Sequence, residues 1–94
     1  MAAHWGTFHP RMSSNVGLST GNNVLTEQGY SLIEPLKNGA HMIVGQRGDL
    51  IVAIHSMPEG DGTWMSVFAY SGDSAEAELA RNTVRTEIMK RVEF

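Results

Sequence analysis

The stretch HMIVGQRGDLIVAIHSM, residues 41–57, predicts two adjacent β-strands joined by a tight turn. Aliphatic and β-branched residues fill its two halves, and the Arg47-Gly48-Asp49 segment between them has the chemistry of a turn. A strand with one wet face alternates apolar and polar side chains, whereas these strands are apolar at nearly every position. Both faces of the sheet are therefore expected to be covered.

Turn signals on either side extend this hairpin into a four-stranded antiparallel meander. Asn38-Gly39 lies between two β-rich runs, and it is a strong hairpin signal because both central positions of a type I′ turn need positive φ. A longer turn is predicted at residues 58–62, where proline, glycine and acidic residues cluster. The four strands are expected at residues 31–37, 40–46, 50–57 and 63–71.

A helix is predicted before the meander, within SSNVGLSTGNNVLTEQGY at residues 13–30. Ser13 or Ser14 is available as its N-cap, and Gly29 is placed like the residue that follows a C-cap. Four residues share one side of this helix: Gly17, Gly21, Val24 and Gln28. That side is flat and can approach a sheet closely. The alternative is an irregular loop with a final helical turn, because each internal glycine costs a helix roughly 1 kcal/mol.

A second helix is predicted after the meander, within GDSAEAELARNTVRTEIMKRVEF at residues 72–94. Asp73 and Glu76 have the spacing of a capping box, acids fill the first turn, and bases gather towards the far end. Residues at helical spacing form the expected core stripe: Ala77, Ala80, Val84, Ile88 and Val92. Leu79 and Met89 fall outside this stripe.

The first segment, AHWGTFHP at residues 3–10, is short, aromatic and closed by Pro10, which favours an edge strand or an ordered arm. A chain of 94 residues buries enough surface for one modest core. We therefore predict a single α+β domain over residues 1–94. It consists of an N-terminal arm or edge strand, a helix, a four-stranded antiparallel meander and a C-terminal helix packed on the sheet.

The register of the last hairpin decides which side chains share a face with His55. A five-residue loop at residues 58–62 pairs Met57 with Thr63 and sets His55 opposite Met65. One face is then aromatic, with Ile43, Leu50, Val52, Ile54, Trp64, Phe68 and Tyr70. The other face is slimmer, with Met42, Val44, Ile51, Ala53, His55, Met57, Met65 and Val67. A four-residue loop would instead move Trp64, Phe68 and Tyr70 to the histidine side.

Composition excludes several classes of protein. Seven lysines and arginines against ten acids give a net charge of −3, so there is no overall basic field to hold nucleic acid. No run of about 18 apolar residues is present, which excludes a membrane span, and the first residues lack the pattern of a secretory signal. We expect a cytoplasmic protein with no cofactor and no nucleic-acid or membrane partner.

A second copy of the chain is the expected partner. Two helices can cover one apolar face of the sheet, which leaves only residues 1–12 for the other face. A homodimer through that face, or a small apolar ligand, would cover it, whereas a sheet wrapped fully by both helices and the arm is the alternative. The ligand or interface candidates are Met42, Val44, Ile51, His55, Met57, Met65, Arg81 and Arg85. The predicted function is that of a small non-enzymatic binding domain.

The rival hypothesis is a small enzyme that uses His55 as an acid or base with Asp49 or Glu59 nearby. A strand-end histidine held by one ring hydrogen bond explains the same residue without catalysis. With no cysteine in the chain, a metal would depend on histidine and carboxylate ligands. The histidines lack any spacing that enforces convergence, so no metal site is predicted. The candidates for such ligands are His4, His9, His41 and His55.

Overall fold

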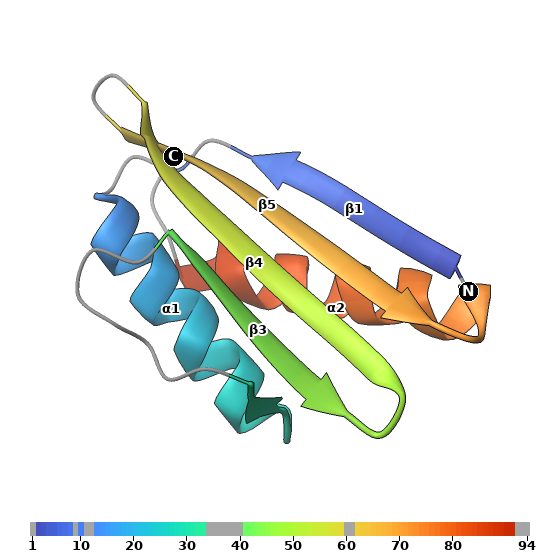
Figure 1. Ribbon diagram of the computed structural model, residues 1–94. Helices are drawn as coiled ribbons and strands as arrows, with labels where there is room; N and C mark the ends of the chain where they lie inside the picture. Colours follow the sequence, from blue (N-terminus) through green and yellow to red (C-terminus); the bar gives the residue numbers. More distant parts are fainter. Residues whose placement is uncertain (1, 9, 11–12, 34–40, 60–61, 92–94) are drawn as a thin grey trace.

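The computed structural model describes residues 2–8, 10, 13–33, 41–59 and 62–91, with the backbone alone for residues 2–8 and 59 (Figure 1). Its elements are β1 (Ala2–Phe8), α1 (Ser14–Glu27), β2 (Ser31–Leu32), β3 (Met42–Arg47), β4 (Leu50–Glu59), β5 (Gly62–Ser71) and α2 (Ser74–Arg91). The strands form one antiparallel sheet in the order β1-β5-β4-β3-β2. The predicted α+β fold is confirmed.

The first segment is an edge strand, one of the two forms expected for it. β1 pairs with β5 along its whole length, from Ala2 opposite Ser71 to Phe8 opposite Met65. The segment therefore widens the sheet at its edge. The first strand of the meander is described at its start, where β2 spans Ser31–Leu32 and the Ile33 amide donates a hydrogen bond to the carbonyl of Val44, and residues 34–37 of the predicted strand lie outside the described residues. The Asn38-Gly39 turn lies outside the described residues.

Both helices pack against the same face of the sheet (Figure 1). The strands contribute to this core the buried residues Ile43, Leu50, Val52, Ile54, Met65, Val67 and Ala69. The helices contribute Leu18, Val24, Leu25, Ala77, Ala80, Val84 and Ile88, and Tyr30 closes the core after α1. Along β4 the buried residues alternate with less buried ones, at Leu50, Val52, Ile54 and Ser56, as expected from the two-residue period of a strand.

The N-terminal helix forms as its caps predict, and the loop alternative is wrong. The Ser13 hydroxyl accepts a hydrogen bond from the Val16 amide at 3.2 Å. At the other end Gly29 has φ of +85°, and the amides of Gly29 and Tyr30 donate to the carbonyls of Thr26 and Leu25. This is the Schellman pattern, in which a left-handed residue returns the chain and satisfies the last carbonyls.

The two internal glycines let α1 approach the sheet closely, which is the reason that their spacing suggested. A Cβ built on Gly21 would lie 2.9 Å from Cδ1 of Ile54, and one on Gly17 would lie 3.0 Å from Sδ of Met65. Neither space is free for a side chain. The packing energy from this close contact of helix and sheet offsets the unfavourable helix propensity of the two glycines.

The C-terminal helix confirms the predicted stripe over the described residues. Ala77, Ala80, Val84 and Ile88 are buried, while Val92 lies outside the described part of the chain. Leu79 is 67% exposed, but Met89 packs partly against the core. The buried side of α2 is therefore wider at its C-terminal end than the predicted stripe.

The N-cap of α2 departs from a simple capping box. Oδ1 of Asp73 accepts hydrogen bonds from the amides of Ala75 and Glu76, as a cap should. The Glu76 carboxylate accepts from the Ser71 hydroxyl at 3.2 Å, and that hydroxyl accepts from the Asp73 amide at 3.1 Å. Glu76 therefore acts on the Asp73 amide through a serine.

The predicted register of the β4–β5 hairpin is wrong by one residue. Met57 pairs with Trp64, His55 with Ser66 and Ala53 with Phe68, because Glu59 already pairs with Gly62. A shift of one residue exchanges the faces of β5. Met65 and Val67 therefore join the core, and the aromatic residues of β5 lie on the side of His55. The closeness of the helices explains this outcome, since slim side chains fit beneath Gly17 and Gly21.

Candidate functional site

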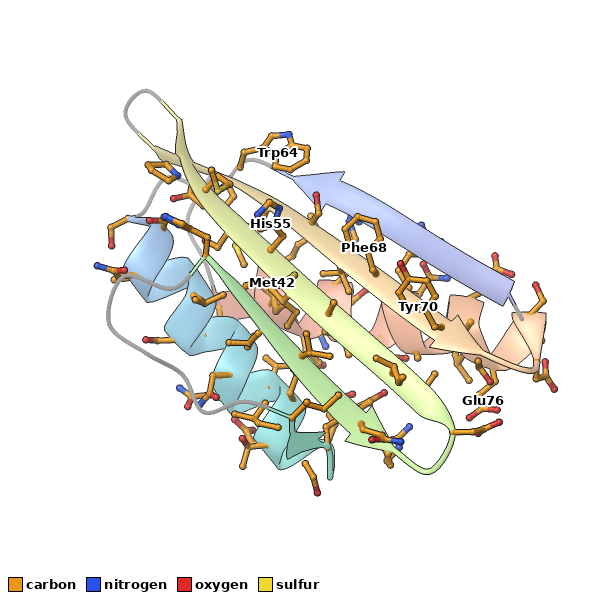
Figure 2. The ribbon with its side chains drawn as sticks, viewed as in Figure 1. Met42, His55, Trp64, Phe68, Tyr70 and Glu76 are labelled. Atoms are coloured by element: carbon orange, nitrogen blue, oxygen red, sulfur yellow. The ribbon has the colours of Figure 1, made fainter. Side chains whose placement is uncertain are left out.

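The sheet has one face that neither helix covers. We call it the open face, and its described side chains are Met42, Val44 and Gln46 on β3; Ile51, Ala53, His55 and Met57 on β4; and Trp64, Ser66, Phe68 and Tyr70 on β5. Figure 2 shows the labelled members of this set on the side of the sheet turned away from the helices. The short loop at Gly48-Asp49 and the edge position of β1 leave this face uncovered in the described part of the chain.

The described part of the open face is mostly apolar and carries no fixed charge. Met42 is 55% exposed and Met57 is 37% exposed, whereas the aromatic residues of β5 are half-buried. None of its described side chains is a lysine, arginine, aspartate or glutamate. Methionine and aromatic residues without fixed charges are typical of the centre of a protein–protein interface.

His55 lies near the middle of this face, on the central strand of the sheet. Met42 on β3 and Ser66 on β5 are its register partners. Its imidazole meets the Trp64 ring edge-on, with centroids 6.4 Å apart and planes at 88°. The surroundings of this histidine are therefore an indole, a thioether and a hydroxyl.

Ser66 places a buried hydroxyl on this face. The residue is 1% exposed although it lies on the open face, and its hydroxyl is buried without a hydrogen-bond partner in the described structure. Trp64 and Phe68 lie on either side of it along β5, two residues away on the same face. Most buried hydroxyls have a hydrogen-bond partner, so this one stands out as an unpaired polar group among apolar side chains of the described structure.

Of the two acids expected to assist His55, the structure describes the side chain of Asp49 alone, and Asp49 lies away from the histidine. Asp49 lies six residues before His55, about 20 Å away along an extended strand. Glu59 ends β4, four residues beyond His55, and only its backbone is described. The described residues contain no group of three or more histidine, cysteine, aspartate and glutamate side chains that would hold a metal ion.

Three of the sequence-predicted candidates lie away from the open face. Met65 is fully buried in the core opposite Ser56. Arg81 and Arg85 are half-buried on α2, which packs against the opposite face of the sheet. The remaining candidates, Met42, Val44, Ile51, His55 and Met57, do share the open face.

Electrostatic perturbations also lie away from the open face. Burial raises the pKa of Tyr30, and the Arg47 guanidinium, 4.6 Å above the ring, partly opposes this shift. A bidentate hydrogen bond from the Arg91 guanidinium to the Glu27 carboxylate, at 2.6 and 2.9 Å, lowers the pKa of Glu27. It links the C-terminal end of α1 to the C-terminal end of α2. These interactions have structural roles and converge on no common site.

A hollow of about 270 Å³ lies along α2, lined by Asn82, Thr83, Thr86 and Glu87. These residues come from a single exposed helix surface and lie on the other side of the molecule from His55. No helix in the described part of the chain combines the length and apolar character needed to cross a membrane.

Comparison with known proteins assigns no relative. A scan against protein-family models and a search of curated proteins found no match to this sequence. The inferences about function therefore depend on the surface of the molecule.

Sequence reasoning from the preferred register missed Trp64, Ser66, Phe68 and Tyr70 as members of the site. The small residues of the helices were a signal that could have placed these side chains on the open face. Small residues at helix positions that face a sheet demand close packing, and the slim series Thr63, Met65, Val67, Ala69 and Ser71 suits it better than the aromatic series.

Proposed function

We propose that this protein is a non-enzymatic interaction domain that works as a homodimer, with the open faces of two copies packed against each other. One observation carries the proposal: a wide apolar sheet face that neither helix covers. Large exposed apolar patches on small domains mark sites of association. A single patch that meets its own copy across a two-fold axis gives a closed dimer.

The size of the face is consistent with a stable contact. Strands β1, β5, β4 and β3 lie side by side, which at about 4.8 Å per strand gives a width of about 19 Å. β4 has ten residues, about 33 Å at the rise of a strand. Because β3 and β1 have only six and seven residues, the flat projection of the four strands is about 500 Å², before the relief of the side chains, and a standard interface buries about 800 Å² on each partner.

A second copy suits this surface better than a small apolar ligand. Ligand sites are usually concave and enclose most of the ligand, whereas the open face is the broad surface of neighbouring strands in one sheet. The absence of charged side chains on its described part also favours another apolar face as its partner.

Sedimentation at micromolar concentration tests the dimer. The expected mass is twice the 10.3 kDa of the chain. Met42→Lys should give a folded monomer, because it places a charge in the interface at a position that is 55% exposed in a single copy. Leu79→Lys is the matched control, since Leu79 is an exposed apolar residue on α2 and should leave the dimer intact. A parent protein that stays monomeric at high concentration would contradict the proposal.

A small enzyme based on His55 is the second candidate, and one observation favours it. Ser66, whose hydroxyl has no hydrogen-bond partner in the described structure, lies opposite His55 in the register, and an imidazole and a hydroxyl are the two members of a base–nucleophile pair. No described acid completes the set. A screen with activated esters would support this candidate if turnover vanished in both His55→Gln and Ser66→Ala while folding and assembly stayed unchanged.

A further inference from the structure

We infer that His55 makes the dimer pH-dependent: two copies associate while the imidazole is neutral and separate when it is protonated. This inference rests on the proposed dimer through the open face. It assigns to His55 the control of assembly, a role that is distinct from catalysis.

The position of His55 in the sheet is the first argument. β4 is the central strand, with two strands on one side and two on the other, and His55 lies near the middle of the apolar surface. A contact that covers this face with a second copy therefore removes the imidazole from water. It is half-buried already in the single chain, with its edge-on contact to Trp64.

The described side chains around His55 supply no opposite charge. From β3 it faces Met42 and Val44; from β5 it faces Trp64, Ser66 and Phe68; along β4 its neighbours on this face are Ala53 and Met57. Tyr70 is the other titratable side chain described on the open face, and Asp49 is at the opposite end of β4. His4, on β1, pairs in register with Ala69, a residue of the covered face.

The cost of burying a charge sets the direction of the effect. An imidazolium transferred into an apolar interface loses its hydration and finds no carboxylate among the described neighbours, whereas the neutral ring loses much less. The neutral form is thus favoured in the dimer, and the charged form is favoured in the separated chains. Dimer affinity is therefore greatest while the imidazole is neutral and falls as the pH is lowered.

The size of the effect follows from linkage. Each histidine that must lose a proton on association weakens dimerisation by up to about ten-fold per pH unit below its midpoint in the free chain. A symmetric dimer contains two copies of His55, so the limit is roughly a hundred-fold per pH unit.

Sedimentation equilibrium between about pH 8 and about pH 5, at fixed ionic strength, tests this inference. The Kd of the parent dimer should rise steeply as the pH falls, while circular dichroism shows that the chains stay folded. His55→Gln, which is neutral throughout, should dimerise with a Kd that hardly changes with pH. His41→Gln removes an exposed histidine that is not part of the open face, and should behave like the parent.

Glu59→Gln completes the set, because Glu59 is the nearest acid along β4. This variant should keep the pH dependence of the parent. A constant Kd for the parent dimer, or an unchanged slope in His55→Gln, would overturn the role of His55 and leave the dimer standing. Loss of the slope in Glu59→Gln would also overturn it, since the carboxylate would then be the titrating partner. A monomer at every pH would overturn the proposed dimer and this inference with it.

Discussion

The two faces of one sheet differ in a way that follows from what packs against them. The covered face carries Val52, Ile54, Val67 and Ala69, all fully buried beneath helices whose contact surfaces are rich in glycine and alanine. The open face carries methionine, tryptophan, phenylalanine and tyrosine, partly exposed. Both faces are apolar, but only the covered one is packed within the single chain. Hydrophobicity alone therefore does not distinguish a core from an interface. The two are distinguished by the size of the side chains and by how closely other elements pack against them.

The largest expected effect is a charge placed in the covered face. Val84→Asp on α2 would bury an uncompensated carboxylate among fully buried residues, and should cost about 4 kcal/mol of unfolding free energy. Leu79→Asp, on the exposed side of the same helix, should cost far less. Urea unfolding gives both values. If Val84→Asp does not fold, Val84→Ala should still lose about 2 kcal/mol through the cavity that it leaves. Equal stability of the two aspartate variants would break the comparison.

Neighbouring residues on β3 sharpen the contrast between the faces. Ile43 is buried in the core and Met42 is exposed on the open face. Ile43→Ala should lose about 3 kcal/mol at any protein concentration, because the cavity lies within one chain. The effect of Met42→Ala on stability should appear only at concentrations where the dimer forms. Unfolding curves recorded at several concentrations separate the two cases. A concentration-independent loss of similar size in Met42→Ala would contradict the assignment of the faces.

The close approach of α1 is tested by adding volume at Gly21. A valine there would overlap Ile54, since even a Cβ would lie 2.9 Å from Cδ1 of that side chain. The expected loss is about 2 kcal/mol by thermal or urea unfolding, the usual cost of overpacking a core. Asn23→Val is the control, because Asn23 is exposed on the same helix. A loss as large in the control would mean that helix propensity, and not the contact with the sheet, causes the effect.

The smallest expected effect belongs to the ion pair between the helix ends. Glu27→Gln removes the bidentate contact with Arg91, and should lower the melting temperature slightly and more at low salt, because the pair is exposed. The pKa of Glu27 is lowered in the folded chain, so this contribution is present above the ordinary pKa of a glutamate and is lost as the pH falls through the lowered value. Glu78→Gln makes the same charge change at another exposed site. A salt-independent effect of equal size in both variants would show that the pair contributes nothing specific.

Much of the fold could be predicted because its signals are local. Ser13, Gly29 and Asp73 begin or end helices through hydrogen bonds to residues two to four positions away, so their roles are encoded in short segments. The turn at Gly48-Asp49 is local in the same sense, with Gly48 at φ of +65°. The candidate site was predicted less well, because it combines side chains from three strands and depends on their alignment.

The sequence by itself determined the order of the elements, the caps of the helices, the buried stripe of α2 and the presence of two apolar sheet faces. Tertiary structure alone decided which face holds Trp64, Phe68 and Tyr70, and thus what surrounds His55. The physical reason is the two-residue period of a strand. Shifting the β4–β5 pairing by one residue exchanges the two faces of β5, and either register leaves both faces apolar. The helices select between the two registers, because their glycine and alanine surfaces lie too close to the sheet for aromatic rings. Met65, Val67 and Ala69 fit in that space instead.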